Sequence, residues 1–311
     1  MRRLEPGRVL RWTAGIGAAL LFWYLFLVWP PPLYYRWFWP RETAFMAMRD
    51  HREVRPPAAE EARRVPRHSA SVAPPRAYRP VPLDSISPWL ARAALVGEDN
   101  RFFEHRGLDV VELRKALGYP RDDFHWGETR DREALRRALG RAWSRRDRLR
   151  GASTITQQLA KNLYLSPSRN PLRKVKEALL AWRLETALGK RRILELYLNV
   201  AEFGDNVWGA EAAARSYFGT SARNLTREQA AALAASLPFP LRSNPGYRPG
   251  RMRWRQQLIL RRLRGERLDV PKDDEEIERQ APLEDAGEGS VPPVPAPAPD
   301  SAPPPAGDSV P

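Results

Sequence analysis

A run of 18 residues without a charged side chain, residues 12–29, is the feature that most restricts how this chain can fold. As a helix the run would rise about 27 Å, close to the thickness of the hydrocarbon core of a bilayer. Tryptophans stand at both ends, as is common at membrane interfaces, and arginines precede it. A cleaved signal peptide is the alternative, but prolines follow the run where a small-residue cleavage site would be needed. We therefore expect residues 12–29 to be one retained membrane span, with residues 1–11 in the cytoplasm and the remaining residues outside it.

The remainder of the chain divides by composition into three parts. Residues 30–79 are rich in proline and charge, and we expect them to form a stalk. Residues 266–311 are acidic and proline-rich, so they cannot bury enough apolar surface to fold and are predicted to be a disordered tail. Residues 80–265 are the predicted folded domain.

Net charge limits the classes of partner that this domain is expected to bind. The whole sequence carries +15, but the tail holds 12 acidic and 3 basic side chains, so residues 1–265 carry +24. Nucleic acid, an anionic membrane surface and a phosphorylated substrate are candidates on charge alone. A nucleic-acid platform would interleave basic and aromatic residues on one surface and leaves the polar run described below unexplained, so we expect no nucleic acid partner. The absence of cysteine excludes disulfides and thiolate metal sites.

Helical periodicity dominates the domain. Residues 172–188 and 190–200 place apolar residues at helical spacing, and Thr226 with Gln229 forms a capping box for a helix over 227–236. Almost no segment alternates as a strand would, so the predicted fold is mainly α. Residues 110–150 form a basic insertion whose end, residues 130–150, holds nine arginines around one apolar helical face. That helix is either a solvated basic helix or one that lies on the membrane surface.

Glu98 is a candidate general base. It ends a helical segment that begins with Pro88 after Ser87 as N-cap, and Phe102 lies just beyond it. Desolvation by aromatic surface and the helix dipole both disfavour an ionised carboxylate there, as suits a base for a sugar hydroxyl. The simpler alternative is that Glu98 and Asp99 are surface acids that cap the turn.

A second candidate element is the polar run GASTITQQLAKN over residues 151–162. Its side chains offer many neutral donors and one cation, which suits sugar hydroxyls and phosphate oxygens. A polar helix face capped by Ser153 or Thr154 is the other interpretation. The run contributes the candidate substrate-binding residues Ser153, Thr154, Gln157, Gln158 and Lys161.

Glu177 is the second candidate catalytic carboxylate. Arg173 lies four residues before it, so an ordinary surface ion pair is the simplest explanation. The helical wheel nevertheless places Glu177 on the same side as Leu180 and Leu184, toward packed surface. The basic side chains that could gather near it for a polyanion are Lys161, Arg169, Arg173 and Lys174.

Taken together, five ordered motifs resemble the peptidoglycan glycosyltransferases of family 51, and more closely its monofunctional members, over about residues 80–260. The first three motifs contain Glu98, Asp99, Phe102, His105 and Gly107, then Gly151, Ser153, Thr154, Gln157, Gln158, Lys161 and Asn162, then Arg173, Lys174 and Glu177. The last two contain Ile193, Leu194, Glu195, Tyr197, Leu198 and Asn199, then Gly204, Gly209, Ala213, Tyr217, Phe218 and Gly219. Two features depart from the pattern: Ala152 replaces a common glycine, and the segment between the first two motifs is long.

The resemblance implies a lysozyme-like helical fold that polymerises lipid II at the outer face of the bacterial cytoplasmic (inner) membrane. It implies that Glu98 is the base on the acceptor's 4-hydroxyl and that Glu177 assists the departing lipid pyrophosphate. The expected partners are lipid II, the lipid-linked glycan chain, the membrane and other cell-wall synthesis proteins. The expected substrate-binding residues are Asp99, Phe102, His105, Ser153, Thr154, Gln157, Gln158, Lys161, Arg169, Arg173, Lys174 and Asn199.

Some alternatives stay open at this point. A divalent cation, Mg²⁺ or Mn²⁺, could bridge Glu177 and the pyrophosphate, or the basic side chains could suffice; no organic cofactor is expected. A lysozyme-like peptidoglycan-cleaving enzyme would also use two carboxylates, but cleavage of a neutral glycosidic bond does not require a cluster of cations. A non-catalytic cell-envelope scaffold could use the stalk and tail but has no use for Glu98 and Glu177.

Overall fold

The structure is a computed structural model that is mainly α-helical over the residues it describes, as the sequence predicts. The described residues are 15–17, 19–20, 23, 27–50, 76–119, 125, 127–144, 153–165, 171–272, 277 and 280. Their strands form one small sheet in the order β1-β3-β2, with β1 parallel and β2 antiparallel to β3. The strands are β1 (Ala77–Tyr78), β2 (Glu202–Gly204) and β3 (Val207–Trp208).

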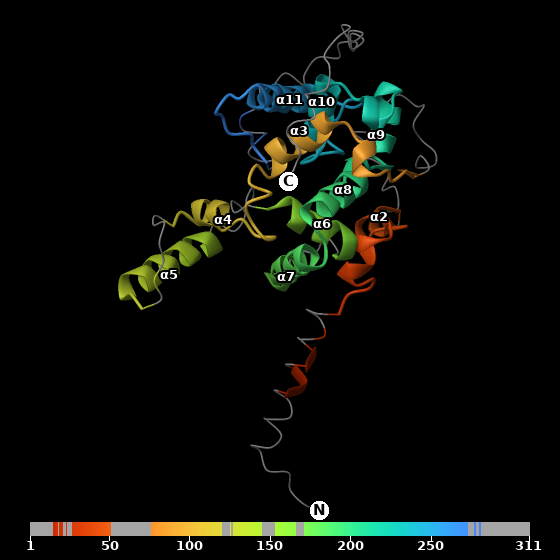
Figure 1. Ribbon diagram of the computed structural model, residues 1–311. Helices are drawn as coiled ribbons and strands as arrows, with labels where there is room; N and C mark the ends of the chain where they lie inside the picture. The colour runs from red at the N-terminus through yellow and green to blue at the C-terminus, as the bar shows by residue number, and fades with distance from the viewer. Residues whose placement is uncertain are drawn as a thin grey trace, which may run out of the picture.

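The helices gather in two groups, with α4 and α5 set to one side (Figure 1). One group consists of α3 (Pro88–Glu98), α9 (Ala210–Phe218), α10 (Arg227–Ser236) and α11 (Gly250–Leu263). The other consists of α2 (Ala44–Asp50), α6 (Ile155–Tyr164) and α7 (Pro171–Ala187), and α8 (Lys190–Val200) lies between the groups. The set-aside pair is α4 (Val110–Leu117) and α5 (Thr129–Ser144), and short 3-10 turns are η1 (Pro32–Arg36), η3 (Leu83–Ser85) and η5 (Ala222–Asn224).

Local sequence signals account for most helix boundaries. The predicted capping box begins α10: the Thr226 hydroxyl accepts from the Gln229 backbone N–H at 3.2 Å, and the Gln229 side chain accepts from the Thr226 N–H at 3.0 Å. The predicted helices over 172–188 and 190–200 match α7 and α8 within one residue. Ser87 stands at the N-cap of α3, but its hydroxyl donates to the Leu225 carbonyl at 2.9 Å instead of capping the helix.

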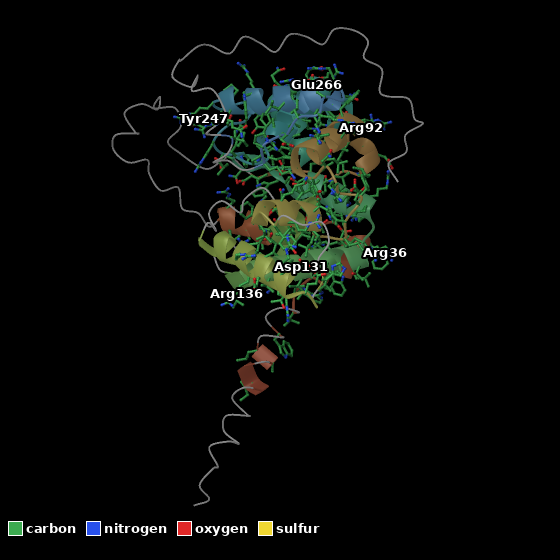
Figure 2. All side chains as sticks on the ribbon, turned by 90° about the vertical axis from the view of Figure 1, so that its left-hand side faces the viewer. Arg36, Arg92, Asp131, Arg136, Tyr247 and Glu266 are labelled. Carbon is green, nitrogen blue, oxygen red and sulfur yellow. The ribbon has the colours of Figure 1, made fainter. Side chains whose placement is uncertain are left out.

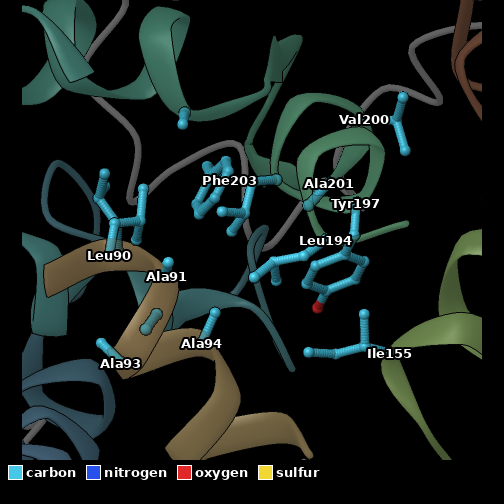
Figure 3. Close-up of a cluster of buried hydrophobic side chains, with 14 of the residues drawn as sticks. Leu90, Ala91, Ala93, Ala94, Ile155, Leu194, Tyr197, Val200, Ala201 and Phe203 are labelled. Atoms are coloured by element: carbon cyan, nitrogen blue, oxygen red, sulfur yellow. The ribbon is translucent and has the colours of Figure 1, made fainter. Parts of the chain in front are cut away.

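Small side chains let α3 pack closely in the core. Its buried face is largely alanine, and Figure 3 shows Ala91 and Ala94 on the side that faces Tyr197 of α8 and Ile155 of α6. Tyr197 is almost completely buried, with its ring in this apolar cluster. The close packing of α3, α6 and α8 fixes the C-terminal end of α3, where Glu98 lies.

The folded domain begins earlier than residue 80, which corrects the expected stalk over residues 30–79. Tyr35 and Met46 are buried in the core, and Phe45 of α2 packs edge-to-face on Trp208 with ring centroids 5.9 Å apart. Arg49 also donates to Glu202 at 2.8 Å. These apolar contacts, which proline content obscures in the sequence, make residues 32–50 part of the domain. Residues 51–75 lie outside the described residues.

The domain also ends later than residue 265, which corrects the predicted start of the tail at residue 266. Val270 is 9% exposed and Ile277 is fully buried, and both belong to the core cluster. Residues 281–311 lie outside the described residues.

Most of the predicted membrane span, residues 12–29, also lies outside the described residues. Among the residues that are described, no helix combines the length and apolar character needed to cross a membrane.

Candidate active site

Glu98 is the last residue of α3, as predicted, and its carboxylate is held from two sides. The residue is 3% exposed. Its Oε2 accepts a hydrogen bond of 2.8 Å from the Gln158 side-chain amide of α6, and its Oε1 accepts one of 2.9 Å from Arg255 Nη2 of α11. The guanidinium offsets the unfavourable position of a carboxylate at a helix C-terminus and its desolvation. The alternative of a surface acid pair at this turn is therefore wrong.

Arg255 is a residue of the site that sequence reasoning missed. It is one of several arginines in α11, and no local motif distinguishes it. Helical spacing could have done so, because Arg255 falls on the stripe defined by the buried residues Met252 and Ile259. An arginine on an apolar stripe is rarely buried without an acidic partner, so the stripe predicts an ion pair.

Asp99 and His105 form a buried pair that fixes the start of α6. His105 Nε2 lies 3.0 and 3.1 Å from the two carboxylate oxygens of Asp99, and Oδ2 of Asp99 also accepts from the Ile155 backbone N–H at 2.9 Å. A carboxylate at a helix N-terminus is favoured by the helix dipole. Phe102 is buried beside this pair, edge-to-face with His105 at 6.3 Å. The predicted substrate-binding residues Asp99, His105 and Phe102 therefore support the loop that follows Glu98.

Thr154 and Gln157 form the capping box of α6. Thr154 Oγ1 accepts from the Gln157 N–H at 3.1 Å, and the Gln157 side chain accepts from the Thr154 N–H at 3.1 Å. The Thr154 hydroxyl also donates to the Gly107 carbonyl at 2.7 Å. Gly107 has a φ of 91°, and a Cβ there would meet the backbone of Ala181 at 3.0 Å, so a glycine is needed. Thr154 and Gln157 thus act structurally, as the cap interpretation allowed.

Glu177 is a buried carboxylate that holds two cations. The residue is 3% exposed, and it accepts hydrogen bonds from Arg173 Nη1 at 3.1 Å and from Lys174 Nζ at 2.5 Å. The predicted i,i+4 ion pair is present, but Leu180 and Leu184 beside it are fully buried, as the helical wheel indicated. Lys174 Nζ also donates to Ser153 Oγ at 3.0 Å, which joins α7 to the start of α6.

Lys161 of α6 is a cation whose pKa is shifted by its surroundings. Burial of its ammonium group lowers the pKa of Lys161 below the usual value for lysine, and the charges of Lys174 and Arg173 add to that shift while those of Glu177 and Glu98 partly oppose it. Its ammonium also lies 5.8 Å from the ring centroid of Phe45 in α2. The site therefore contains two buried carboxylates, Glu98 bonded to Arg255 and Glu177 bonded to two cations.

Two comparisons with known proteins bear on this arrangement. A model of the transglycosylase family matches residues 122–264. A biosynthetic peptidoglycan transglycosylase of Bordetella avium is 44% identical over 194 residues, which cover 62% of this chain and 72% of that protein. This chain belongs to the peptidoglycan transglycosylases, the family 51 glycosyltransferases that its motifs resemble. A second relative, from Shigella boydii, is 45% identical over 183 residues, and there the chain spans 66% of the relative's length.

Other predicted site residues of this transglycosylase do not join the cluster. Asn199 is fully buried: its Oδ1 accepts from the Val81 N–H at 2.8 Å, and its Nδ2 donates to the carbonyls of Val81 and Glu195. Both amide donors are used, so the prediction that Asn199 binds substrate is wrong, and the residue ties the segment before α3 to α8. Arg169 lies outside the described residues.

A cavity of about 200 Å³ opens beside Asp99 and Ser153 of the transglycosylase. Its walls come from the end of α3, from α4, from the start of α6 and from residues that follow α11, including Asp269 and Lys272. Sequence analysis missed this wall because it assigned residues 266–311 to the tail.

Possible metal ligands gather in the loop that follows Glu98. Among the described residues, Asp99, His105 and Asp109 place possible ligand atoms within 4.8 Å of one another. These groups already bind each other and backbone N–H groups. Glu177 is held by Arg173 and Lys174, whereas Mg²⁺ needs several oxygen ligands in octahedral geometry. The surroundings of Glu177 do not fit the metal site that the sequence left open.

Proposed function

We propose that this transglycosylase is a glycan-strand polymerase that transfers the growing lipid-linked chain onto the 4-hydroxyl of lipid II and releases polyprenyl pyrophosphate. The observation that carries the proposal is a pair of buried carboxylates in different settings. Glu98 is held by Gln158 and Arg255, whereas Glu177 bears two cations. Relatives named biosynthetic peptidoglycan transglycosylases support the substrate class. The helical arrangement supports the lysozyme-like fold that the motifs imply.

In the proposed reaction, Glu98 takes the proton of the acceptor 4-hydroxyl as that oxygen attacks the anomeric carbon of the donor chain. The bond from that carbon to the pyrophosphate oxygen breaks, and the configuration at the carbon inverts. Gln158 and Arg255 hold the carboxylate in one orientation through hydrogen bonds of 2.8 and 2.9 Å. A fixed base positioned in advance is the usual requirement for general-base catalysis.

The cations supply the other half of the reaction. Negative charge grows on the pyrophosphate as the bond breaks, and Lys161, Arg173 and Lys174 would stabilise it. Glu177 holds two of these cations at 3.1 and 2.5 Å and so fixes where the leaving group binds. We propose that these side chains suffice without a divalent cation. A peptidoglycan-cleaving enzyme would leave this cluster without a role.

We further propose that the protein is anchored in the bacterial inner membrane by residues 12–29, with the catalytic domain on the outer side. Leu172, Val175 and Trp182 lie on one face of α7 and are 48%, 55% and 53% exposed. Exposed apolar side chains grouped in this way are typical of a surface that meets a membrane. In Figure 2, Arg36 and Arg136 lie at the same end of the body. A reporter fused after residue 60 should be active only outside the cytoplasm, and a cytoplasmic signal would refute this topology.

Incubation of the purified full-length protein with lipid II tests the polymerase proposal. Separation of the products should show glycan strands longer than the disaccharide and release of polyprenyl pyrophosphate. Addition of EDTA should leave the rate unchanged. Failure to consume lipid II, together with release of fragments from preformed peptidoglycan, would replace the polymerase by a cleaving enzyme, and no reaction with either would favour a scaffold.

A further inference from the structure

Arg255 is fully buried and joins four segments of the chain. Its Nε donates to the Pro271 carbonyl at 2.7 Å, and its Nη1 donates to the carbonyls of Ala234 and Ala235 at 2.7 and 3.3 Å. Its Nη2 donates to the Gly97 carbonyl at 2.7 Å and to Glu98 Oε1 at 2.9 Å. Every nitrogen of the guanidinium is therefore bonded, and only one of the acceptors is charged.

The carbonyl acceptors determine where the guanidinium can lie. A guanidinium is planar with donors in a fixed fork, so bonds from Nε and Nη1 leave little freedom to Nη2. Gly97 lies in the last turn of α3, and Ala234 and Ala235 lie in the last turn of α10, where the helix dipoles favour a cation. Space is restricted as well, because a Cβ on Gly97 would lie 3.3 Å from Nη2. Nη2 is thus fixed at Glu98 by the ends of two helices and by the segment that follows α11.

We propose that Arg255 is a positioning residue for catalysis: it sets the orientation in which the Glu98 carboxylate meets the acceptor hydroxyl. The inference rests on the proposed polymerase function, in which Glu98 is the base. Gln158 holds the other carboxylate oxygen but carries no charge. Arg255 is therefore the directly bonded cation on this carboxylate among the described residues.

Two substitutions separate the charge of Arg255 from its geometry. Arg255→Met removes both, and its kcat with lipid II should fall at least about tenfold with KM nearly unchanged, because an ion pair to the base is lost. Arg255→Lys keeps the charge but not the fork, so its kcat should also fall, by less than in Arg255→Met, with KM again nearly unchanged. Arg253→Met, at an exposed position of the same helix, is the matched control and should change neither kcat nor KM.

Thermal melting tests whether Arg255 and Glu98 are coupled. Arg255→Met leaves the Glu98 carboxylate buried without its cation, so the double variant Glu98→Gln with Arg255→Met should melt at a higher temperature than Arg255→Met alone. If Arg255→Met fails to fold, Arg255→Lys still reports whether kcat falls while KM stays nearly unchanged, which a purely structural role would not produce. Folded Arg255 variants with wild-type kcat would overturn the inference, as would a double variant that melts no higher. If the wild-type protein does not polymerise lipid II, the proposed function fails, whereas the melting comparison still decides whether the two residues are coupled.

Discussion

The side-chain amide of Gln158 donates to Glu98 at 2.8 Å and accepts a hydrogen bond of 3.0 Å from the Tyr197 hydroxyl. Tyr197 thereby selects the amide orientation in which nitrogen, and not oxygen, faces the carboxylate. Burial, above all, raises the pKa of Tyr197 well above its usual value, so its hydroxyl stays protonated and keeps donating at neutral pH. The carboxylate of Glu98 is thus oriented by a series of hydrogen bonds that begins at Tyr197 of α8.

Substitution of Gln158 should slow the reaction without blocking substrate binding. Gln158→Leu removes a hydrogen bond to a charged group, worth about 1.5–3 kcal/mol, so kcat should fall about 10- to 100-fold. Tyr197→Phe leaves the amide in place but free to flip, and we expect a smaller loss. Steady-state kinetics with lipid II measure both. A larger loss of kcat in Tyr197→Phe than in Gln158→Leu would contradict the proposal that Tyr197 acts through Gln158.

Glu98→Gln should abolish turnover while lipid II still binds. Glutamine keeps the shape but cannot take a proton, and general-base effects are about 10²-fold or more. Glu104→Gln, in the same loop with a side chain 62% exposed, is the control and should be as active as the wild type. Near-normal polymerisation by Glu98→Gln would remove Glu98 from the role of base.

Replacement of Lys161 should increase stability and decrease activity. The pKa of Lys161 is lower in the folded protein than in the unfolded chain, so the unfolded state binds more protons between the two values and stability from this group rises with pH. Below the folded pKa the buried charge costs stability, and Lys161→Met should therefore raise the melting temperature at pH 7. The same change should weaken donor binding and lower kcat.

The control for Lys161 is Arg191→Met, which removes a half-exposed cation of α8 and should leave both quantities unchanged. Activity of the wild-type enzyme should also decline at a pH below that of an ordinary lysine titration, as Lys161 loses its proton. A Lys161→Met variant that melts well below the wild type would show that its charge is stabilising.

The effect of truncation on the melting temperature should depend on whether the chain ends before residue 270 or after residue 277. A chain that ends at residue 280 retains Val270, Pro271 and Ile277 and should melt close to the full-length protein. A chain that ends at residue 265 loses two buried aliphatic side chains, at about 1.5–3 kcal/mol each, and an acceptor of Arg255. Its melting temperature should fall by about 10 °C or more, as differential scanning calorimetry can measure. Equal melting of the two truncated chains would mean that the segment does not pack in solution.

Sequence patterns placed α7, α8 and α10 well because each of these helices has a local signature. α10 carries its own capping box, and Glu177 shares a helical face with buried leucines, so both could be placed without tertiary information. Glu98 could be placed at a helix end because Gly97 and the following loop interrupt the apolar pattern.

Contacts between distant segments could not be predicted in the same way. Lys161 is near Phe45 only because α2 folds back onto α6, and no pattern within residues 30–79 indicates where that segment packs. Asn199 belongs to a motif that resembles the family pattern, yet resemblance does not tell whether a side chain faces substrate or a neighbouring backbone. The partner of Glu98 lies 157 residues away, and only its helical spacing reveals it.

That separation along the chain affects when the enzyme can become active during synthesis. Glu98 is made early, but its cation and the carbonyl of Pro271 are added only when nearly the whole domain has been translated. Until then the Glu98 carboxylate of a nascent chain lacks both the hydrogen bond and the positive charge that Arg255 supplies. A chain whose synthesis ends before residue 255 would therefore carry Glu98 without the cation that holds it, so the placement of the base depends on completion of the last part of the domain.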